Sequence, residues 1–239
     1  MLPLGGTAIG TGFGAPAGYR AAVFAHLGGL TGVAFAPAAD SFDAMQNMDV
    51  FARVSAELRT CAASLSKIAS DLIVLSSGPN GGLGEIRLPA VQAGSSIMPG
   101  KVNPVVPMAM VQLGFAVSGN DCCVGQAVQW GQLEINHFEP VVADRVFESI
   151  HLLTRGVRLF RERCLAGIEA DVAANEKHLF ESMAIATALI PTLGYARVSA
   201  LARQSLAEGR ALGELLDEAG VLTLAQSRVL TEKAARPSF

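Results

Sequence analysis

The longest stretch of the chain without proline or glycine contains Asp43 to Ser77, and it constrains the fold more than any other feature. Apolar residues recur along it at spacings of three and four, which places them on one face of an α-helix. They are Met48, Phe51, Val54, Leu58, Cys61, Leu65, Ile68, Leu72 and Leu75. Asp40 or Ser41 can cap the start of this helix, and Gly78-Pro79 ends it. At a rise of about 1.5 Å per residue the helix is about 50 Å long, so its apolar face must pack against other long helices.

Two further segments have the same character. From Pro140, which suits the first turn of a helix, apolar residues continue at helical spacing as far as Gly167. They are Val142, Val146, Ile150, Leu153, Val157, Phe160 and Cys164. Pro104 to Gln126 predicts a third helix, so poor in charge that we expect it to be the most deeply buried. Because residues 85–88 are the one short strand candidate, the sequence predicts an all-α fold built on a long-helix bundle.

After Gly167 the chain changes to shorter helical segments in which charged residues return. The expected helices are Asn175–Ile190, Tyr195–Glu208, Leu212–Glu218 and Leu224–Glu232. We therefore expect two domains, a long-helix bundle over residues 1–167 with a mobile connection at 78–103, and a small C-terminal helical subdomain over residues 168–239. A DNA-binding helix-turn-helix is the alternative interpretation of the second domain, but the segment is not basic.

The composition limits the partners that the protein can have. The net charge is −3, and lysine and arginine are scattered along the chain, which argues against nucleic acid. Apolar residues make up 51% of the chain and charged residues only 16%, so little polar surface is left for a monomer. A large apolar interface between subunits is the expected destination of this excess.

Three uncharged stretches, 21–39, 102–120 and 122–133, raise the question of a membrane. Each is interrupted by glycine, proline or polar side chains or is too short to cross about 30 Å of hydrocarbon, so we expect no membrane segment. The glycine-rich N-terminus lacks the positive charge of a secretory signal. The four cysteines, Cys61, Cys122, Cys123 and Cys164, lack metal-binding spacing and are interpreted as buried thiols of a reduced cytoplasmic protein.

The connection before Pro104 carries the residues best suited to chemistry. It is glycine-rich and ends in Ser95-Ser96, Lys101 and Asn103, just before a charge-poor helix begins. Exposed N–H groups at a helix start attract anions, and the ammonium, hydroxyl and amide groups add further donors. Ser95 is the candidate for proton transfer, provided that nearby donors stabilise its alkoxide. The alternative is an ordinary capped helix with a solvated lysine.

The string Gly-Ser-Ser-Ile-Met-Pro-Gly-Lys-Val-Asn-Pro at 94–104 resembles the signature of the fumarase/aspartase superfamily, in its class II fumarase and aspartase branch. Further segments throughout the chain resemble the same family. These segments are 5–12, 66–69, 76–79, 119–121 and 194–195. The resemblance implies the long-helix bundle of that superfamily. Residues 46–49, 54–55 and 101–107 look more like aspartases than fumarases.

The resemblance implies a reversible anti-elimination of ammonia from L-aspartate to give fumarate, with fumarate hydration or another elimination on a succinyl-type substrate as the alternative. Ser95 matches the general base of the family, and Ser96, Lys101 and Asn103 match positions that bind the carboxylates of a small dicarboxylate substrate. The resemblance implies no metal and no organic cofactor. It implies a homotetramer or a complex with a separate N-terminal half.

Two departures from the family are visible. The chain resembles only the C-terminal half of a family subunit, and its histidines, which do not match the catalytic motif, are expected to be structural. They are His26, His137, His151 and His178. Met108 occupies the position of a glutamate that partners the missing histidine, and a thioether cannot replace that carboxylate. The chain is therefore a fragment, a subunit that needs an N-terminal partner, or a catalytically inactive helical oligomerisation module.

Overall fold

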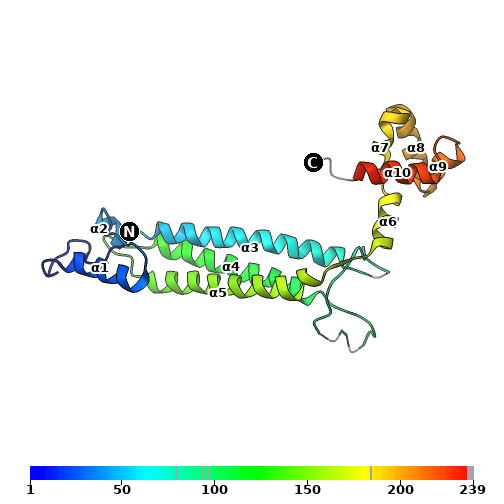
Figure 1. The fold of residues 1–239 in the computed structure, drawn as a ribbon. Helices are drawn as coiled ribbons and strands as arrows, with labels where there is room; N and C mark the ends of the chain where they lie inside the picture. The colour runs from blue at the N-terminus through cyan, green and yellow to red at the C-terminus, as the bar shows by residue number, and fades with distance from the viewer. Residues whose placement is uncertain (79, 93, 96, 184, 236–239) are drawn as a thin grey trace. The chain divides into compact units, whose positions relative to one another are not determined.

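The computed structural model describes residues 1–78, 80–92, 94–95, 97–183 and 185–235, and nearly all regular structure in them is helical (Figure 1). The α-helices are α1 (Tyr19–Thr31), α2 (Ser41–Gln46), α3 (Asp49–Leu75), α4 (Val105–Gln129), α5 (Glu139–Arg163), α6 (Val172–Glu181), α7 (Ile185–Leu193), α8 (Tyr195–Glu208), α9 (Leu212–Glu218) and α10 (Leu224–Ala235). A 3₁₀ turn spans Leu165–Gly167, and β1 (Ile86–Arg87) pairs antiparallel with β2 (Glu169–Ala170). The expectation of an all-α fold is confirmed.

The chain forms two compact units. The first contains Met1–Ile73 and Pro89–Gly167, and the second contains Val74–Leu88 and Ile168–Phe239. The sequence predicted a single change of domain after Gly167. The structure additionally assigns the segment from Val74 to Leu88 to the second unit, because β1 pairs with β2.

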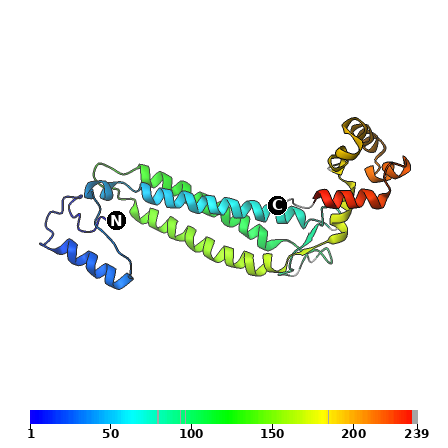
Figure 2. The same ribbon diagram turned by 45° about the horizontal axis from the view of Figure 1, so that its top comes forward.

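Three long helices form the bundle of the first unit. α3, α4 and α5 lie side by side and alternate in direction (Figures 1 and 2). The turn between α4 and α5 is held by Asn136, whose amide Nδ2 donates to the carbonyl oxygens of Ala127 at 3.0 Å and Val128 at 3.3 Å. Its Oδ1 accepts the N–H of Phe138 at 2.9 Å. This buried asparagine satisfies the carbonyls at the end of α4 and starts α5 beside it.

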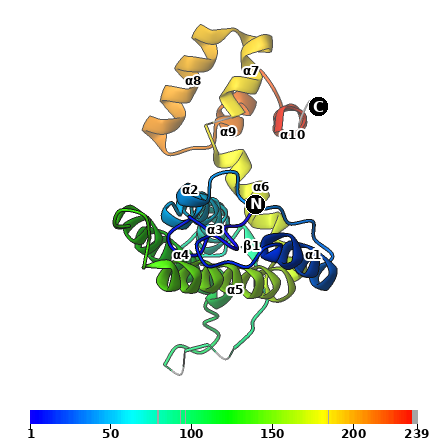
Figure 3. The ribbon, with the colours of Figure 1, turned by 90° about the vertical axis from the view of Figure 1, so that its left-hand side faces the viewer.

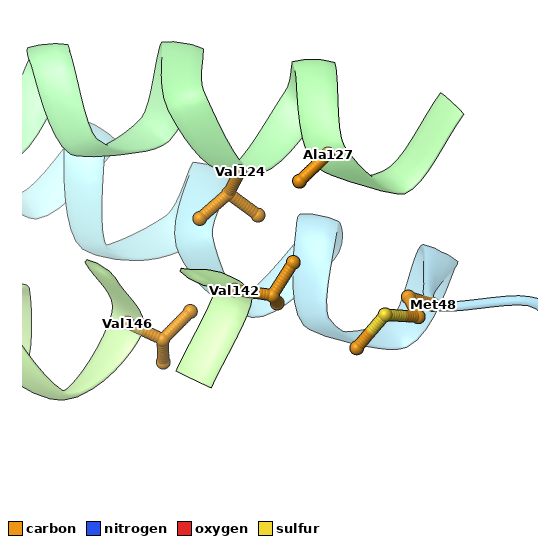
Figure 4. Close-up of a cluster of buried hydrophobic side chains, with 5 residues drawn as sticks. All are labelled: Met48, Val124, Ala127, Val142 and Val146. Carbon is orange, nitrogen blue, oxygen red and sulfur yellow. The ribbon is translucent and has the colours of Figure 1, made fainter. Parts of the chain in front are cut away.

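The core at this end of the bundle comes from α4, α5 and the residue before α3, with Leu58 of α3 packed against it. Met48, Val124, Ala127, Val142 and Val146 are buried together (Figure 4). Along α5 the expected apolar face is buried at Leu153 and Phe160, and Cys164 is buried just after the helix. Ile150 and Val157 of the same face are each 41% exposed, so the single chain covers that face incompletely.

The buried face of α3 differs from the one that the spacing predicted. Small residues at intervals of seven, Ser55, Ala62 and Ala69, are almost fully buried, whereas Phe51 and Ile68 are 48% and 46% exposed. The physical reason is close approach between helices, because α3 meets α4 at a glycine. A methyl group placed on Gly114 would lie 2.1 Å from Ser66 Oγ and 3.6 Å from Ala62 O. Phe51, Val54 and Ile68 of the predicted face are therefore exposed, whereas Leu58, Leu65 and Leu72 remain partly buried.

The charge-poor helix α4 has more buried residues than any other described helix, as expected, but it is buried on one face only. Val106, Met110, Val117 and Val124 are buried, but Phe115 on the opposite side is 70% exposed. Helices of this composition are typical of interiors. The described residues therefore leave this apolar face of α4 uncovered, like Phe51 and Ile68 on α3.

A polar layer crosses the bundle at the Asn120-Asp121 pair of α4. Ser55 Oγ donates to Asp121 Oδ1 at 2.7 Å, and Arg59 Nε lies 2.8 Å from Asp121 Oδ2. On the other side Asn120 Nδ2 donates to Ser149 Oγ at 3.1 Å. Because a buried polar group is costly without a partner, these bonds favour one axial alignment of α3, α4 and α5.

Two expected helices are each divided. Asp40 does cap a helix, through its Oδ1 and the N–H of Phe42 at 2.8 Å, but α2 ends at Gln46 because Asn47 is extended. The expected helix Asn175–Ile190 is replaced by α6 and α7, since Ser182 is also extended. Pro191 lies inside the last turns of α7 instead of ending it.

The second unit is a small helical assembly. α7, α8, α9 and α10 pack on one another around the buried residues Leu189, Val198, Leu212 and Leu216 (Figure 3). The bounds of α8 and α9 agree with the sequence prediction, and α10 extends three residues beyond it. In neither unit does a described helix combine the length and apolarity needed to span a membrane.

Candidate functional site

The site predicted by the sequence lies on the connection between α3 and α4. We call residues 94–104 the signature loop. Its neck is narrow, because a methyl group placed on Gly94 would lie only 1.4 Å from the carbonyl oxygen of Lys101. The backbone of Gly94 therefore packs directly against the backbone of Lys101, and this contact closes the loop immediately before α4 begins.

Ser95 organises the first half of the signature loop. Its Oγ accepts the backbone N–H of Ile97 at 3.1 Å and that of Met98 at 3.2 Å. This is the local bonding by which serine side chains start a turn. The turn continues through Gly100, which has a φ of +79°, and ends with the N–H of Lys101 donating to the Met98 carbonyl at 3.2 Å.

The electrostatics of the loop favour negative charge. Two N–H groups point at Ser95 Oγ, and donors aimed at an oxygen favour its deprotonated form. Lys101 is exposed and has no ion-pair partner in the part of the chain that the structure describes. The first turn of α4 follows directly, with no acidic residue and no side-chain cap. Pro104 and Pro107 have no N–H and the N–H of Val105 donates to the Asn103 carbonyl at 2.8 Å, so the N–H of Val106 and the helix dipole supply the positive potential at this end.

The structure brings some of the predicted residues together and leaves others apart. Ser95 and Lys101 flank the neck of the loop, and Asn103, which is half-buried, lies two residues before α4. Among the described residues, no hydrogen bond joins the side chains of Ser95, Lys101 and Asn103 to one another. Ser96 lies outside the described residues, so its predicted role stays a prediction.

Met108 and the four histidines lie outside the part of the signature loop that precedes α4. Met108 lies in the first turns of α4 and is 44% exposed. His26 lies on α1, His137 stacks on Phe138 with ring centroids 4.2 Å apart, and His151 lies exposed on α5. His178 on α6 contacts a carboxylate. None of the four is in the signature loop.

The two amide groups that contact Ser95 were not predicted from the sequence. Any residue except proline has a backbone N–H, so the residue types of Ile97 and Met98 do not indicate this contact. The available signal was the serine followed four residues later by Pro99-Gly100, a pattern typical of a tight turn whose amides are free to bind a side chain.

An open cleft of about 830 Å³ lies at the root of the connection, in the first unit. Its walls are the segment at Pro89 to Val91, the start of α4 and the end of α5. Glu162 and Arg163 are its charged lining residues. Among the described residues, no group of three histidine, cysteine, aspartate or glutamate side chains could hold a metal ion.

Comparison with known proteins gives consistent results. Residues 1–119 match the sequence family described as Lyase. An aspartate ammonia-lyase of Pseudomonas canavaninivorans is 45% identical over 219 residues, which cover 92% of this chain and 46% of that protein. A class II fumarate hydratase of Pseudomonas syringae pv. tomato is 43% identical over 222 residues, which cover 93% of this chain and 48% of that protein.

Solved structures agree in fold. A fumarate lyase:delta crystallin from Brucella melitensis, bound to cobalt, superimposes with a TM-score of 0.92 at 43% identity, covering 98% of this chain and 51% of that one. The recombinant class II fumarase of Schistosoma mansoni has a TM-score of 0.88 at 30% identity, covering 98% and 53%. The chain thus spans about half the length of the relatives that it matches.

Proposed function

This chain belongs to the fumarase/aspartase family of lyases, and from that premise we propose that it is the C-terminal half of an aspartate ammonia-lyase subunit. The reaction is the reversible elimination of ammonia from L-aspartate to give fumarate. The observation that carries the proposal is Ser95, whose Oγ accepts two backbone N–H groups near Lys101, which has no ion-pair partner among the described residues.

Ser95 acts as the general base. As an alkoxide it removes a proton from the carbon next to one substrate carboxylate. The electron pair of that C–H bond moves onto the carboxylate and gives a dianionic intermediate, which then expels the amine as ammonia while the double bond forms. A serine can hold the necessary negative charge only if donors surround it. The amides of Ile97 and Met98 are such donors.

Carboxylate binding involves the other end of the loop. The Lys101 ammonium and the Asn103 amide are donors suited to a carboxylate, and the N-terminus of α4 adds its dipole. Because charge grows on the carboxylate as the proton leaves, donors placed there stabilise the transition state more than the substrate. Ser96 belongs to the same predicted set.

Fumarate hydration is the alternative within the same chemistry. In the reverse direction, the dehydration of malate, it uses the same base and a corresponding dianionic intermediate, but the hydroxyl must gain a proton to leave as water, whereas an ammonium group leaves as ammonia. The two relatives, at 45% and 43% identity, support both reactions almost equally. The aspartase-like residues at 46–49 and 101–107 favour ammonia as the leaving group.

A second candidate function is a catalytically inactive oligomerisation module. Two observations favour it: Met108 offers no carboxylate at the start of α4, and the large apolar side chains Phe115 and Phe147 are 70% and 68% exposed on the bundle. On either proposal the chain associates with further helices, as a homotetramer or as a complex with an N-terminal half.

The proposals are separated by a complementation assay. The chain is co-expressed with the N-terminal half of the aspartate ammonia-lyase of Pseudomonas fluorescens, a 46% identical relative. Fumarate formed from L-aspartate is followed by its ultraviolet absorbance, and malate is offered in parallel. Turnover of aspartate supports the ammonia-lyase and turnover of malate supports the hydratase. Stable complex formation without turnover supports the inactive module.

Replacement of the proposed base gives the first specific prediction. Ser95→Ala lowers kcat at least about 100-fold, since proton transfer by a positioned side chain contributes that much or more. The matched control is Ser64→Ala, at an exposed serine on α3 whose hydroxyl bonds only its own helix. Unchanged turnover in Ser95→Ala rejects the assignment of the base.

Replacement of the proposed carboxylate ligand gives the second. Lys101→Ala raises KM for aspartate about tenfold or more, because a charge-assisted bond to the carboxylate contributes about 1.5–3 kcal/mol. Lys233→Ala, an exposed lysine on α10, is the control and leaves KM unchanged. A Lys101→Ala enzyme with wild-type KM and kcat contradicts this role.

A further inference from the structure

The chain that enters the signature loop is packed against the end of α5. Gly167 ends the 3₁₀ turn that follows α5, and a methyl group placed on it would lie 2.6 Å from Pro89 Cγ. Ordinary contacts between carbon atoms are about 3.5–4.0 Å, so the Pro89 ring occupies the space that a side chain at position 167 would need. Pro89 and Gly167 belong to the same compact unit as Ser95.

Both partners of this contact have little freedom to move. The backbone N–H of Gly167 donates to the Cys164 carbonyl at 3.2 Å, and the N–H of Cys164 donates to the Phe160 carbonyl at 3.1 Å. Cys164 and Phe160 are 1% and 2% exposed, so the turn that ends at Gly167 is attached to the buried face of α5. The Pro89 ring is closed onto its own backbone and locks φ, so it cannot rotate away from Gly167.

Two further observations connect this contact with Ser95. Val91 lines the open cleft of about 830 Å³ that is also lined by the first turn of α4. Gly94, the residue before Ser95, packs against the backbone of Lys101 at the neck of the loop. The chain from Pro89 therefore leads from the end of α5 to the residues that precede α4. Because the six residues from Pro89 to Ser95 span at most about 22 Å, a fixed Pro89 limits the positions that Ser95 can reach.

We propose that the contact between Pro89 and Gly167 anchors the signature loop on the bundle, so that both are positioning residues for Ser95. The role of Ser95 rests on the function proposed above, whereas the anchor can be tested without turnover. Misplacement of a catalytic group by about 1 Å can cost about 100-fold in rate, so the anchor matters for the reaction although neither residue needs to touch the substrate. Lys101 follows the neck and is joined to the start of α4, so we expect the anchor to affect proton transfer more than carboxylate binding.

Gly167→Ala tests the anchor by hydrogen exchange in the full chain. The added methyl group forces the Pro89 ring to retreat by about 1 Å to reach an ordinary contact distance. The amides of Ile97 and Met98 are the readout, because they donate to Ser95 Oγ. We expect their exchange to become about fivefold faster, whereas amides in the middle of α4 and α5 keep their rates. Gly29→Ala on α1 is the matched control and leaves all of these rates unchanged, because its methyl group meets nothing within 4 Å.

Removal of the proline ring should rescue this variant. In the double variant Pro89→Ala/Gly167→Ala, the nearest remaining side-chain atom of residue 89 is Cβ, which lies 3.7 Å from the new methyl group, an ordinary contact. We therefore expect exchange at Ile97 and Met98 to return to within about twofold of the wild type. If the effects of the two single variants simply add, the two positions are not in direct contact and the anchor is overturned.

An engineered disulfide tests the same contact independently. The 3.7 Å between Pro89 Cβ and the Cβ position at residue 167 lies within the range of about 3.5–4.5 Å found across disulfides. The pair Pro89→Cys/Gly167→Cys should therefore form an internal disulfide under mild oxidation, detected by mass spectrometry of the linked peptides. The two single cysteine variants are the controls for reaction with the native cysteines. Failure of the pair to cross-link overturns the anchor.

An active complex with an N-terminal half adds a kinetic readout. Gly167→Ala should lower kcat about tenfold while KM for aspartate stays within about twofold, and the cysteine pair should have a higher kcat oxidised than reduced. Unchanged kcat in Gly167→Ala overturns the positioning role and leaves Ser95 as the base. Full turnover in Ser95→Ala instead rejects the base and leaves the exchange and cross-linking results untouched, so the two proposals fail separately. Where no complex turns over, exchange at Ile97 and Met98 and the cross-link decide the anchor.

Discussion

At the scale of single residues, Gly94 determines whether the signature loop can close. A side chain at this position would collide with the Lys101 carbonyl, which cannot move without displacing the start of α4. Gly94→Ala should therefore open the neck of the loop and speed amide exchange at residues 97–101. Gly81→Ala is the matched control, since its methyl group meets nothing within 4 Å. Equal exchange in the two variants contradicts a closed neck.

The contact between Gly114 and Ser66 predicts a coupled pair of mutations. Gly114→Ala places a methyl group against the buried Oγ of Ser66 and should destabilise the chain by about 1–3 kcal/mol. Ser66 Oγ has no hydrogen-bond partner among the described residues, so Ser66→Ala should be neutral or slightly stabilising.

The double variant should recover most of the stability lost in Gly114→Ala, and urea unfolding measures the coupling. Gly125→Ala provides the control, because its methyl group meets nothing within 4 Å and alanine has the higher helix propensity. Strictly additive effects at Gly114 and Ser66 would contradict the close packing of α3 on α4.

The side chains of the candidate site could be predicted from the sequence, but their hydrogen-bond partners could not. Ser95 and Lys101 could be selected because residues 94–104 resemble the superfamily signature, whereas their residue types alone left a capped helix with a solvated lysine as the alternative. The donors at Ile97 and Met98 could not, since backbone groups depend on the path of the chain and not on side-chain type. The partner of His178 was also beyond reach, because Glu85 lies 93 positions away.

At the scale of elements, spacing predicted the helices but not which face each one buries. Two faces of α3 have residues at helical spacing, one that begins at Phe51 and one that begins at Ser55. The face of Phe51 is the more hydrophobic, so the sequence predicts that this face is buried. The structure buries the second, because Ser55, Ala62 and Ala69 allow α4 to approach closely. The ends of α2 at Asn47 and of α6 at Ser182 could not be predicted from the sequence, because asparagine and serine are both compatible with a helix.

The junction of α8 and α9 yields a pH prediction. Arg210 forms hydrogen bonds with both carboxylate oxygens of Glu218, and chiefly for this reason the pKa of Glu218 is lowered. A lowered folded-state pKa stabilises the fold above the ordinary glutamate range, and this stabilisation disappears as pH falls through the folded-state pKa. Glu218→Gln should therefore melt below wild type at pH 7, with the difference vanishing toward pH 3.

Thermal unfolding of the full chain, followed by circular dichroism at several pH values, measures this difference. Glu232→Gln is the control, because Glu232 is exposed on α10 without an ion-pair partner among the described residues. A melting difference for Glu218→Gln that persists unchanged at pH 3 contradicts the proposed role of the ion pair.

At the scale of the whole molecule, the division of the chain was only partly predictable. The boundary at Gly167 can be predicted from the sequence, because long helices poor in charge are followed there by short helices with more charged residues. The assignment of Val74–Leu88 to the second unit is not visible. It depends on the pairing of β1 with β2 and on hydrogen bonds from Asp171 and Asn175 to the Glu85 carbonyl. The two-residue strands are too short to give a sequence pattern, and the bonded residues are far apart in the sequence.

The uncovered apolar faces predict that the chain does not remain a monomer. Phe115 on α4 and Phe147 on α5 are 70% and 68% exposed, and large apolar side chains exposed to this extent are typical of an interface between subunits. Light scattering should give a mass well above that of one 24.8 kDa chain. Phe115→Asp should weaken the assembly without unfolding the chain, since the ring is not part of the buried core, whereas His151→Asp, a polar substitution at an exposed residue of α5, should leave the mass unchanged. A folded wild-type monomer at micromolar concentration would contradict both the lyase half and the inactive module, because each needs further helices over these faces.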